Sequence, residues 1–384
     1  MTNRIYCDKK SISTQHIDNK KRGKFSKIED KRLFKETQRI KVSPFFDALS
    51  RRKMKKIIGL TYDLKTDYKF KDNDPPDANA EFDHPLTIDL IARSIESLGH
   101  KVIKIGNVRN LLKKIDSLKV DIVFNISEGS FGRNRESQVP IILEMMNVPF
   151  VGSDGLTLGL SLDKAMTKKV LISEGIPTPK FFETGDHTDN IAKIKNLKFP
   201  LIVKPAYEGS SKGLSDKSKV EDIGELRRQI EYIVKTYRQS ALVEEFVSGS
   251  EYTVAVIGNS PPEVLSPVQI RIDGKGRLGD KFYTFARIKS SRLEYVCSDK
   301  MDKDLKEKLM SLALRTYKAL DCRDFGRVDF RVDEDNNPYV LEINPLPSLS
   351  SEDVFMCLAN HLGVSYSELI RRILDAAFLR YGLN

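Results

Sequence analysis

From residue 55 onward, short apolar runs alternate with amphipathic segments of helical length, and no other feature restricts the fold as strongly. Short apolar runs predict buried strands, and helical apolar periods predict helices. Up to residue 150, strands are predicted at 55–61, 101–105 and 121–126, and helices at 85–98, between the last two strands and at 136–146. Strands that alternate with helices indicate parallel βαβ units, so we expect an N-terminal α/β domain at 54–150.

Two more units are expected after residue 150, a central one at 151–248 and a C-terminal one at 249–384. The predicted central elements are helices at 163–174 and 222–237 and strands at 199–204 and 241–245. The predicted C-terminal elements are short strands, a helix at 302–320, strands at 326–332 and 338–343, and final helices. The chain is therefore predicted to be α/β, with an α+β arrangement in its C-terminal half.

Charge is distributed unevenly along the chain. Residues 1–53 contain 16 Lys and Arg against 6 Asp and Glu, so they carry the whole net charge of +10. The other residues contain 48 of each sign, which argues against a basic nucleic-acid-binding body. We interpret 1–53 as a basic, partly disordered extension. No apolar run reaches the roughly 18 residues of a membrane span. The four cysteines form no CxxC pair, which predicts reduced thiols and a cytoplasmic protein.

Three short motifs point to other functions. Gly209–Gly213 matches GxSxG, in which Ser211 would be the nucleophile of a serine hydrolase and His361 its base. The GxGxxG match at 274–279 precedes no predicted helix, so we interpret it as a turn between strands, followed by strand or loop. The SxxK match at 161–164 lacks its partner motifs, and we expect Ser161 to cap the next helix.

The centre of the chain carries features suited to a nucleotide. Lys204 ends an apolar strand, and a loop of small residues follows at 208–213. A lysine at a strand end can bind a phosphate, and small residues let backbone N–H groups approach its oxygens. The acids of the 242–251 segment can offer partners to a purine amine and a ribose. A plain surface turn and a plain strand end are the alternatives.

Four polar residues near the C-terminus predict a metal site. In the predicted strands, period 2 places Arg327 and Asp329 on one face, and Glu342 and Asn344 on one face. If the strands pair in a suitable register, these groups converge. Carboxylate and amide oxygens suit Mg²⁺ bound together with nucleotide phosphates. A cross-strand ion pair is the alternative.

Together these motifs resemble the ATP-grasp enzymes, and most closely the D-alanine–D-alanine ligases, over 55–384. The resemblance implies an ATP-grasp fold, ATP as nucleotide and two Mg²⁺ ions, with Mn²⁺ as an alternative. It implies that ATP phosphates are held by Lys164 and Lys204 and by a lid of Ser210, Ser211 and Gly213. It implies that adenine is framed by Glu244, Glu245 and Val247, and that Glu251 binds ribose. The implied metal ligands are Asp329, Glu342 and Asn344, and the implied catalytic groups are Arg327 and Ser210.

Several departures from the family concern the substrates. The glycine-rich turn with a glutamate after the first strand is absent, and Glu81 or Asp83 is the candidate replacement. A histidine-glycine run is replaced by a segment with Arg133 and Arg135, which we expect to bind a carboxylate-rich substrate or to form a solvated loop.

The acceptor side departs as well. At a lid segment that reads Ala-Lys-Tyr in the family, this chain has Arg287 followed by Ile288. Ser348 replaces a glycine, and Asp353 replaces a serine that binds a substrate carboxylate. A carboxylate facing a carboxylate is unfavourable unless a cation intervenes.

We therefore hypothesise an ATP-dependent carboxylate–amine ligase that acts through an acyl phosphate and has an altered acceptor site. Its expected partners are an amino acid or another small carboxylate and an amine. Neither a specific nucleic acid nor a membrane is expected, and the resemblance implies a homodimer. The alternatives are a D-alanine–D-alanine ligase of peptidoglycan synthesis, the serine hydrolase, and an ATP-binding module without catalysis.

Overall fold

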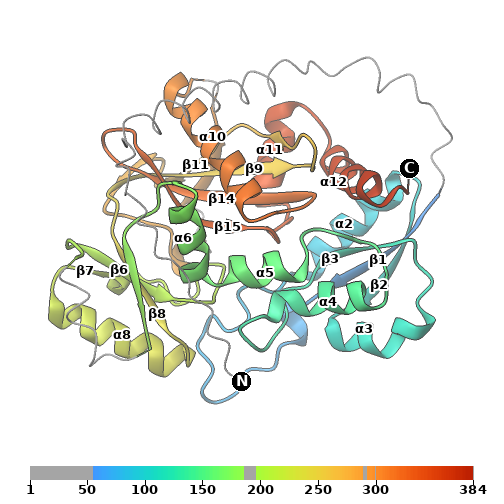
Figure 1. Cartoon of the computed structure of the whole chain (residues 1–384), viewed down its shortest axis with the longest axis horizontal. Coiled ribbons are helices and arrows are strands. Elements are labelled where there is room, and N and C mark those ends of the chain that lie inside the picture. The colour runs from blue at the N-terminus through green and yellow to red at the C-terminus, as the bar shows by residue number, and fades with distance from the viewer. Residues whose placement is uncertain (1–54, 186–195, 289–291, 299, 384) are drawn as a thin grey trace, which may run out of the picture. The chain divides into compact units, whose positions relative to one another are not determined.

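Three β-sheets organise the part of the chain that the computed structural model describes, residues 55–185, 196–288, 292–298 and 300–383 (Figure 1). The predicted basic extension at 1–53 lies outside the described residues. Residues 51–384 form a single unit. The three-domain division of the body therefore stays a prediction, although each predicted domain contains one sheet.

Four parallel strands form the first sheet, in the order β2-β1-β3-β4. The elements are β1 (Ile57–Tyr62), β2 (Lys101–Gly106), β3 (Ile122–Ile126), β4 (Phe150–Val151), α2 (Pro85–Ser97), α3 (Val108–Lys114), α4 (Gln138–Met145), η2 (Lys65–Asp67), η3 (Ile115–Ser117) and η4 (Arg135–Ser137). Helix α2 covers one face, and α3 and α4 cover the other, because their apolar residues enter separate core clusters (Figure 1). The parallel α/β prediction is confirmed.

The second sheet is antiparallel, in the order β5-β8-β6-β7. Its region contains α5 (Gly155–Leu162), α6 (Lys164–Ser173), β5 (Phe181–Thr184), β6 (Leu201–Pro205), η5 (Asp216–Ser218), β7 (Lys219–Val220), α8 (Ile223–Tyr237) and β8 (Ala241–Glu245). Helix α8 packs its apolar stripe on this sheet. Lys204 of β6 and Glu244 of β8 therefore lie on the face of the sheet opposite α8.

The third sheet is antiparallel, in the order β13-β11-β9-β14-β15, with β10 and β12 paired to β9. Its region contains β9 (Gly249–Ile257), β10 (Glu263–Val264), β11 (Val268–Ile272), β12 (Arg277–Gly279), α9 (Phe285–Ile288), β13 (Leu293–Cys297), α10 (Lys303–Ala319), β14 (Phe325–Val332), β15 (Pro338–Asn344), α11 (Val354–Leu362) and α12 (Tyr366–Tyr381). Helix α10 packs on one face of the sheet. Helices α11 and α12 join the opposite face to β1, β3 and α2 in one core. This shared core orients the first sheet relative to the third.

Two local predictions are wrong. Helix α5 is missing from the sequence prediction, because Gly155 and Gly159 lower helix propensity in a segment that tertiary packing nevertheless buries. Ser161 therefore lies inside α5, where its Oγ donates to the carbonyl of Leu158 at 3.1 Å. The cap of α6 is Asp163, whose side chain accepts from the Met166 N–H at 3.0 Å.

The glycine motif at 274–279 forms the predicted turn between strands. Gly274 has φ of +72° between β11 and β12, a conformation that glycine adopts without strain. The following segment, expected as strand or loop, contains the short helix α9. No helix among the described residues is both long and apolar enough to cross a bilayer.

Candidate active site

Arg327, Asp329, Glu342 and Asn344 meet on one face of two paired strands. β14 and β15 are antiparallel, and their register places Arg327 opposite Asn344 and Asp329 opposite Glu342. Arg327 Nε donates to Asp329 Oδ1 at 3.0 Å. Asn344 Nδ2 donates to Asp329 Oδ2 at 2.9 Å. The convergence expected from period 2 is thus present, and all four residues line one cavity.

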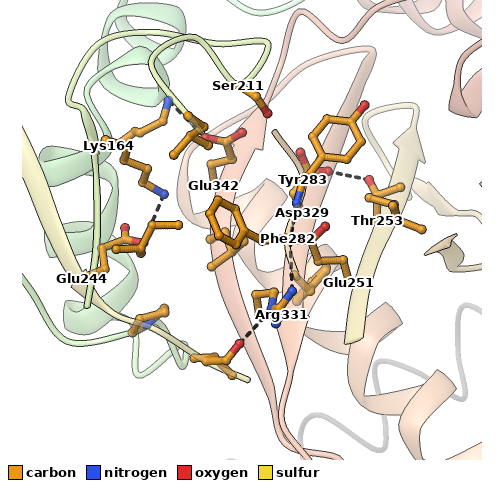
Figure 2. Close-up of a pocket in the computed structure, with 18 of the residues that line it drawn as sticks. Lys164, Ser211, Glu244, Glu251, Thr253, Phe282, Tyr283, Asp329, Arg331 and Glu342 are labelled. Carbon is orange, nitrogen blue, oxygen red and sulfur yellow. Dashed lines mark hydrogen bonds and ion pairs between the residues drawn. The ribbon is translucent and has the colours of Figure 1, made fainter. Parts of the chain in front are cut away.

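The two carboxylates of this cluster have different electrostatic surroundings. Burial disfavours the charged form of Glu342, but the Lys164 and Lys204 ammoniums hold its pKa at about 2. Burial raises the pKa of Asp329, although Arg327 opposes the shift. Thr253 Oγ1 also donates to Asp329 Oδ1, at 2.6 Å (Figure 2). This set of carboxylate and carboxamide oxygens suits a hard divalent cation.

Lysines from α6 and β6 pair with the buried acids. Lys164 is the first residue of α6, and its Nζ lies 3.0 Å from Glu342 Oε2. Lys204 in β6 places its Nζ 3.1 Å from Glu244 Oε2. The structure thus brings both predicted phosphate lysines to the wall of one narrow cavity.

Lys168 is a member of this charge cluster that the sequence analysis missed. Its side chain is fully buried, and its Nζ lies 2.9 Å from Glu244 Oε1. The same Nζ donates to Thr178 Oγ1 at 2.6 Å. Burial lowers the pKa of Lys168 to about 8, although Glu244 opposes the shift. The signal was available in the sequence, because Lys168 lies one turn after Lys164 and so on the same helix face.

A narrow cavity of about 120 Å³ lies between the second and third sheets. Its apolar walls include Phe246, Phe282, Phe330 and Leu341. The predicted nucleotide residues Glu244, Glu245, Val247 and Glu251 line it as well. Figure 2 shows Phe282 between the Lys164 and Glu244 side of this cavity and the strands that carry Glu251 and Asp329.

Glu251 offers one unpaired oxygen to this cavity. Its Oε1 lies 3.2 Å from Arg331 Nη1, whereas its buried Oε2 has no hydrogen-bond partner among the described residues. Burial raises the pKa of Glu251. A buried carboxylate oxygen without a donor is unfavourable, so a ligand hydroxyl would stabilise it.

Arg331 connects several loops around the same cavity and was not predicted. Its guanidinium donates to the carbonyls of Val247, Lys281 and Gly279 at 2.8, 3.0 and 2.8 Å. Its carbon Cζ lies 5.0 Å from the centre of the Phe246 ring. The sequence contained a signal for this residue, because Arg327, Asp329 and Arg331 alternate along one strand and so share one face.

The small-residue loop at 208–213 is a tight, strained turn. Ser210 and Ser211 have φ of +47° and +54°, which only a fixed loop imposes on serine. The Gly213 N–H donates to Asp77 Oδ2 at 2.8 Å. Only the short η5 follows the loop, so the strand–turn–helix elbow that a Ser211 nucleophile needs is absent and the hydrolase interpretation is wrong.

Glu81 lines the larger cavity and binds this loop with both carboxylate oxygens. Its Oε1 accepts from the Gly209 N–H at 2.5 Å and from Arg135 Nη2 at 2.6 Å. Its Oε2 accepts from Lys212 Nζ at 3.2 Å. Burial opposes the charge of Glu81, but the Arg135 guanidinium and the Lys212 ammonium hold its pKa at about 2.

Neither arginine of the 128–138 segment lines a described cavity. Arg135 is buried and binds Glu81 and the Tyr207 carbonyl, the latter at 2.7 Å. Arg133 forms an ion pair with Asp163 and stacks on the Tyr207 ring at 5.1 Å. The structure therefore does not bring these guanidiniums to a substrate carboxylate.

The three predicted acceptor residues lie in different places. Arg287 binds Asp216 at 2.7 Å and the Phe282 carbonyl at 3.0 Å, and it lines neither described cavity. Ser348 and Asp353 line the larger cavity. Asp353 Oδ1 lies 3.6 Å from Arg327 Nη1, so a cation does stand beside this carboxylate.

Two tyrosine hydroxyls that the sequence analysis missed meet beside Arg327. Tyr283 and Tyr295 place their hydroxyl oxygens 2.5 Å apart, and both residues line both cavities. Burial raises the pKa of each phenol, and Asp353 adds to the shift. The phenol groups come from a loop and from β13, which the sequence pattern gave no reason to place side by side.

The larger cavity has a volume of about 810 Å³ and adjoins the metal-type cluster, by which we mean Asp329, Glu342 and Asn344. It extends from the carboxyl end of β3, at Ile126, to the end of β15, at Asn344. Ligands of open α/β sheets lie outside the carboxyl ends of the strands, as here. Its size and position suit a small ligand beside Asp329, Glu342 and Asn344.

Comparison with known proteins gives consistent results. A family model described as "D-ala D-ala ligase C-terminus" matches residues 170–375. The "Uncharacterized protein y4sG" of Sinorhizobium fredii is 34% identical over 301 residues, which are 76% of this chain and 88% of that protein. The D-alanine–D-alanine ligase of Carboxydothermus hydrogenoformans is 33% identical over 296 residues, 75% of this chain and 91% of that one.

Solved structures agree in fold. The crystal structure of the Bacillus anthracis D-alanine–D-alanine ligase complexed with ATP superposes with a TM-score of 0.66 at 24% identity, covering 86% of this chain and 100% of that one. The VanG D-Ala:D-Ser ligase of Enterococcus faecalis gives a TM-score of 0.64 at 21% identity, covering 84% and 100%. The predicted fold class is confirmed.

Proposed function

The chain belongs to the D-alanine–D-alanine ligase family and is an ATP-grasp ligase that forms carbon–nitrogen bonds, and we propose that it joins a small carboxylate to an amine through an acyl phosphate, at an altered acceptor site. The β14–β15 register carries this proposal, because it gathers Arg327, Asp329, Glu342 and Asn344 beside Lys164. Such a cluster of buried charge is costly without a ligand.

The residues present fit ATP and magnesium. The narrow cavity has apolar walls for a purine, and the unpaired Glu251 Oε2 can accept from a ribose hydroxyl. Glu244, Glu245 and Val247 would frame the purine. Lys164 and Lys204 would bind phosphate oxygens as point charges, and Ser210, Ser211 and Gly213 would cover them. Asp329, Glu342 and Asn344 would hold two Mg²⁺ ions, which neutralise phosphate charge when bound.

The reaction needs positioning and charge stabilisation more than a protein nucleophile. A substrate carboxylate oxygen attacks the γ-phosphorus, ADP leaves, and an acyl phosphate forms. The amine, after losing a proton, then attacks the carbonyl carbon, and the C–O bond to phosphate breaks. Arg327 would stabilise the oxyanion of this second step. The products are an amide, ADP and inorganic phosphate.

The residues around Arg327 support the proposal of an altered acceptor. Asp353 stands where the family places a serine, and its position 3.6 Å from Arg327 ties that cation to the protein. Because the guanidinium already faces Asp329 and Asp353, it has less capacity to accept the carboxylate of a second amino acid. The paired Tyr283 and Tyr295 hydroxyls offer other polar contacts to the amine.

Phosphate release from Mg-ATP tests this proposal. The purified chain is supplied with D-alanine alone and then with panels of amino acids and amines, and products are identified by mass spectrometry. Release with formation of an amide supports the ligase. Rapid formation of D-alanyl-D-alanine would contradict the altered acceptor site and favour the alternative that 33% identity to a D-alanine–D-alanine ligase supports. ATP binding without release for any substrate would overturn the ligase function.

The homodimer implied by the resemblance stays a prediction. Sedimentation of the purified chain checks it.

A further inference from the structure

Three glutamates meet on the wall of the larger cavity. Oxygens of Glu81, Glu128 and Glu136 all lie within 4.8 Å of one another. All three residues line the cavity of about 810 Å³. They come from the loop before α2, the loop after β3, and η4. The cluster is therefore assembled by the tertiary structure and not by one segment.

The three carboxylates differ in how they are satisfied. Glu81 accepts from the Gly209 N–H, Arg135 and Lys212. Glu136 is only 8% exposed, yet its side chain makes no hydrogen bond or ion pair within the described part of the chain. Glu128, half-buried, likewise has no such partner among the residues that the structure describes. Two of the three carboxylates thus face the cavity without a hydrogen bond or ion pair among the described residues.

The electrostatic cost of this arrangement is visible in both groups. Burial raises the pKa of Glu136 to about 7, and the charge of Glu81 adds to the shift although Arg135 opposes it. Burial also raises the pKa of Glu128 well above its usual range, and Glu136 contributes. Buried carboxylates without partners are costly, so a cation in the cavity would stabilise both.

The protein does not supply that cation from the side chains nearby. Arg135 and Lys164 are the two cations that act on Glu136. Arg135 uses its guanidinium on Glu81 and the Tyr207 carbonyl. Lys164 binds Glu342 and the Glu208 carbonyl, the latter at 2.5 Å. Both cations are therefore committed to other oxygens.

Hydrogen bonds on both sides of Glu128 hold its loop in place. Asp63, directly after β1, accepts from Ser127 Oγ at 2.5 Å and from the Gly129 N–H at 2.9 Å. Gly129 has φ of +70°, and a Cβ there would lie 2.5 Å from the Arg135 carbonyl oxygen. These contacts fix the residues on both sides of Glu128 and hold its loop against η4.

The lining of the whole cavity is mainly acidic. Its lining includes eight acidic side chains and only three lysines or arginines. The reacting end of a substrate would lie near Lys164 and Arg327, where the proposed reaction takes place. A second, cationic end of the same substrate would meet the glutamates.

We propose that Glu128 and Glu136 bind the side-chain ammonium or guanidinium of a basic amino acid, which is one of the two substrates of the ligase. This inference rests on the proposed function. It replaces the expectation of a carboxylate-rich substrate, since Arg133 and Arg135 are paired within the protein. A divalent metal is a poorer occupant, because both oxygens of Glu81 already accept hydrogen bonds and metals such as Ca²⁺ and Mg²⁺ need about six oxygen ligands.

Steady-state phosphate release from Mg-ATP by the full chain tests the proposal. The substrates are both enantiomers of lysine, ornithine and arginine, compared with both enantiomers of alanine. We expect kcat/KM for one basic amino acid to exceed that for alanine about tenfold or more, the effect of one charged hydrogen bond. Glu128→Gln and Glu136→Gln should each lower that preference about tenfold, mainly through KM. Glu144→Gln, an exposed carboxylate on α4, is the matched control and should leave both values unchanged.

A binding measurement separates this inference from the proposed function. Isothermal titration of lysine, ornithine and arginine into the chain should show binding that Glu136→Gln weakens about tenfold, whether or not turnover occurs. Amide formation from neutral amino acids with no preference for basic ones would leave the ligase standing and overturn the inference. Binding of Mn²⁺ at this cluster without ATP, lost in both variants, would overturn it in favour of a metal site. Circular dichroism checks folding, and the melting temperature of the unliganded Glu136→Gln chain should rise.

Discussion

Two pairs of acidic side chains in the proposed active site differ in how their charge is satisfied. On the proposed nucleotide side, Glu244 has two lysine partners, and Glu342 has Lys164. On the substrate side, Glu128 and Glu136 have no partner of opposite charge among the described residues. The first arrangement holds the site together before a ligand arrives, whereas the second remains uncompensated until a cation enters.

We expect the unpaired carboxylates to determine substrate specificity. Paired charges are satisfied by the fold and can be shared by all members of a family. Unpaired buried carboxylates destabilise the fold, and function is the usual reason to retain them.

Glu342→Gln should have the largest effect. The change removes a charge at the metal-type cluster while keeping the shape of the side chain, so we expect phosphate release to fall about 10²–10³-fold with the fold intact. Circular dichroism and phosphate release on the same samples measure both. Glu334→Gln is the control, because this exposed carboxylate lies on the same β14–β15 hairpin and pairs with Arg277, at 3.0 Å. Unchanged turnover would remove Glu342 from the site.

Glu244→Gln should destabilise the folded chain. It leaves the ammoniums of Lys168 and Lys204 buried without their shared carboxylate, and breaking a buried pair costs about 3–5 kcal/mol. Glu245→Gln changes the neighbouring side chain, which is 23% exposed and 3.9 Å from Lys180, and should cost less than about 1 kcal/mol. Denaturant unfolding gives both values. Equal losses of unfolding free energy in the two variants would show that the ion pairs of Glu244 contribute little to stability.

The pH dependence of stability should report the unpaired side. Glu136 has a pKa of about 7 in the folded chain, above its ordinary 4.5. Between these values the folded state keeps a proton that the unfolded state has released, so stability falls as pH rises through this window. We expect Glu136→Gln to remove a loss of about 1–3 kcal/mol. Unfolding curves of both chains from pH 4.5 to above pH 7 measure it. Parallel curves would mean that Glu136 has an ordinary pKa.

Removal of residues 1–53 should have the smallest effect. None of the residues assigned here to nucleotide, metal or substrate lies in this segment, and its charge is separate from that of the body. Activity should therefore stay within about twofold, since surface changes away from a site usually have small effects. Phosphate release by the shortened chain checks this, and an inactive or unfolded product would contradict it.

Much of the fold and of the nucleotide side was predictable from local patterns. Alternating apolar runs and helical periods predicted the first sheet and its helices, and period 2 placed Arg327 with Asp329 and Glu342 with Asn344. The missing helix α5 shows the limit of such patterns, because its two glycines lower propensity while packing stabilises the helix. Lys168 shows another limit, since helical spacing predicts its face but not that Glu244 of another sheet lies there.

Local patterns in the sequence predicted most strands and helices and which polar residues share a strand face, because these depend on short-range periodicity within single segments. Only the tertiary structure decided which charges are paired. Arg133 and Arg135 were expected either to bind a carboxylate-rich substrate or to form a solvated loop, and the fold pairs them with Asp163 and Glu81. The sequence pattern assigned no role to Glu128 and Glu136, yet the same fold leaves them facing the cavity. Charge pairing depends on which segments meet in space and how much water they exclude, and no local pattern encodes either.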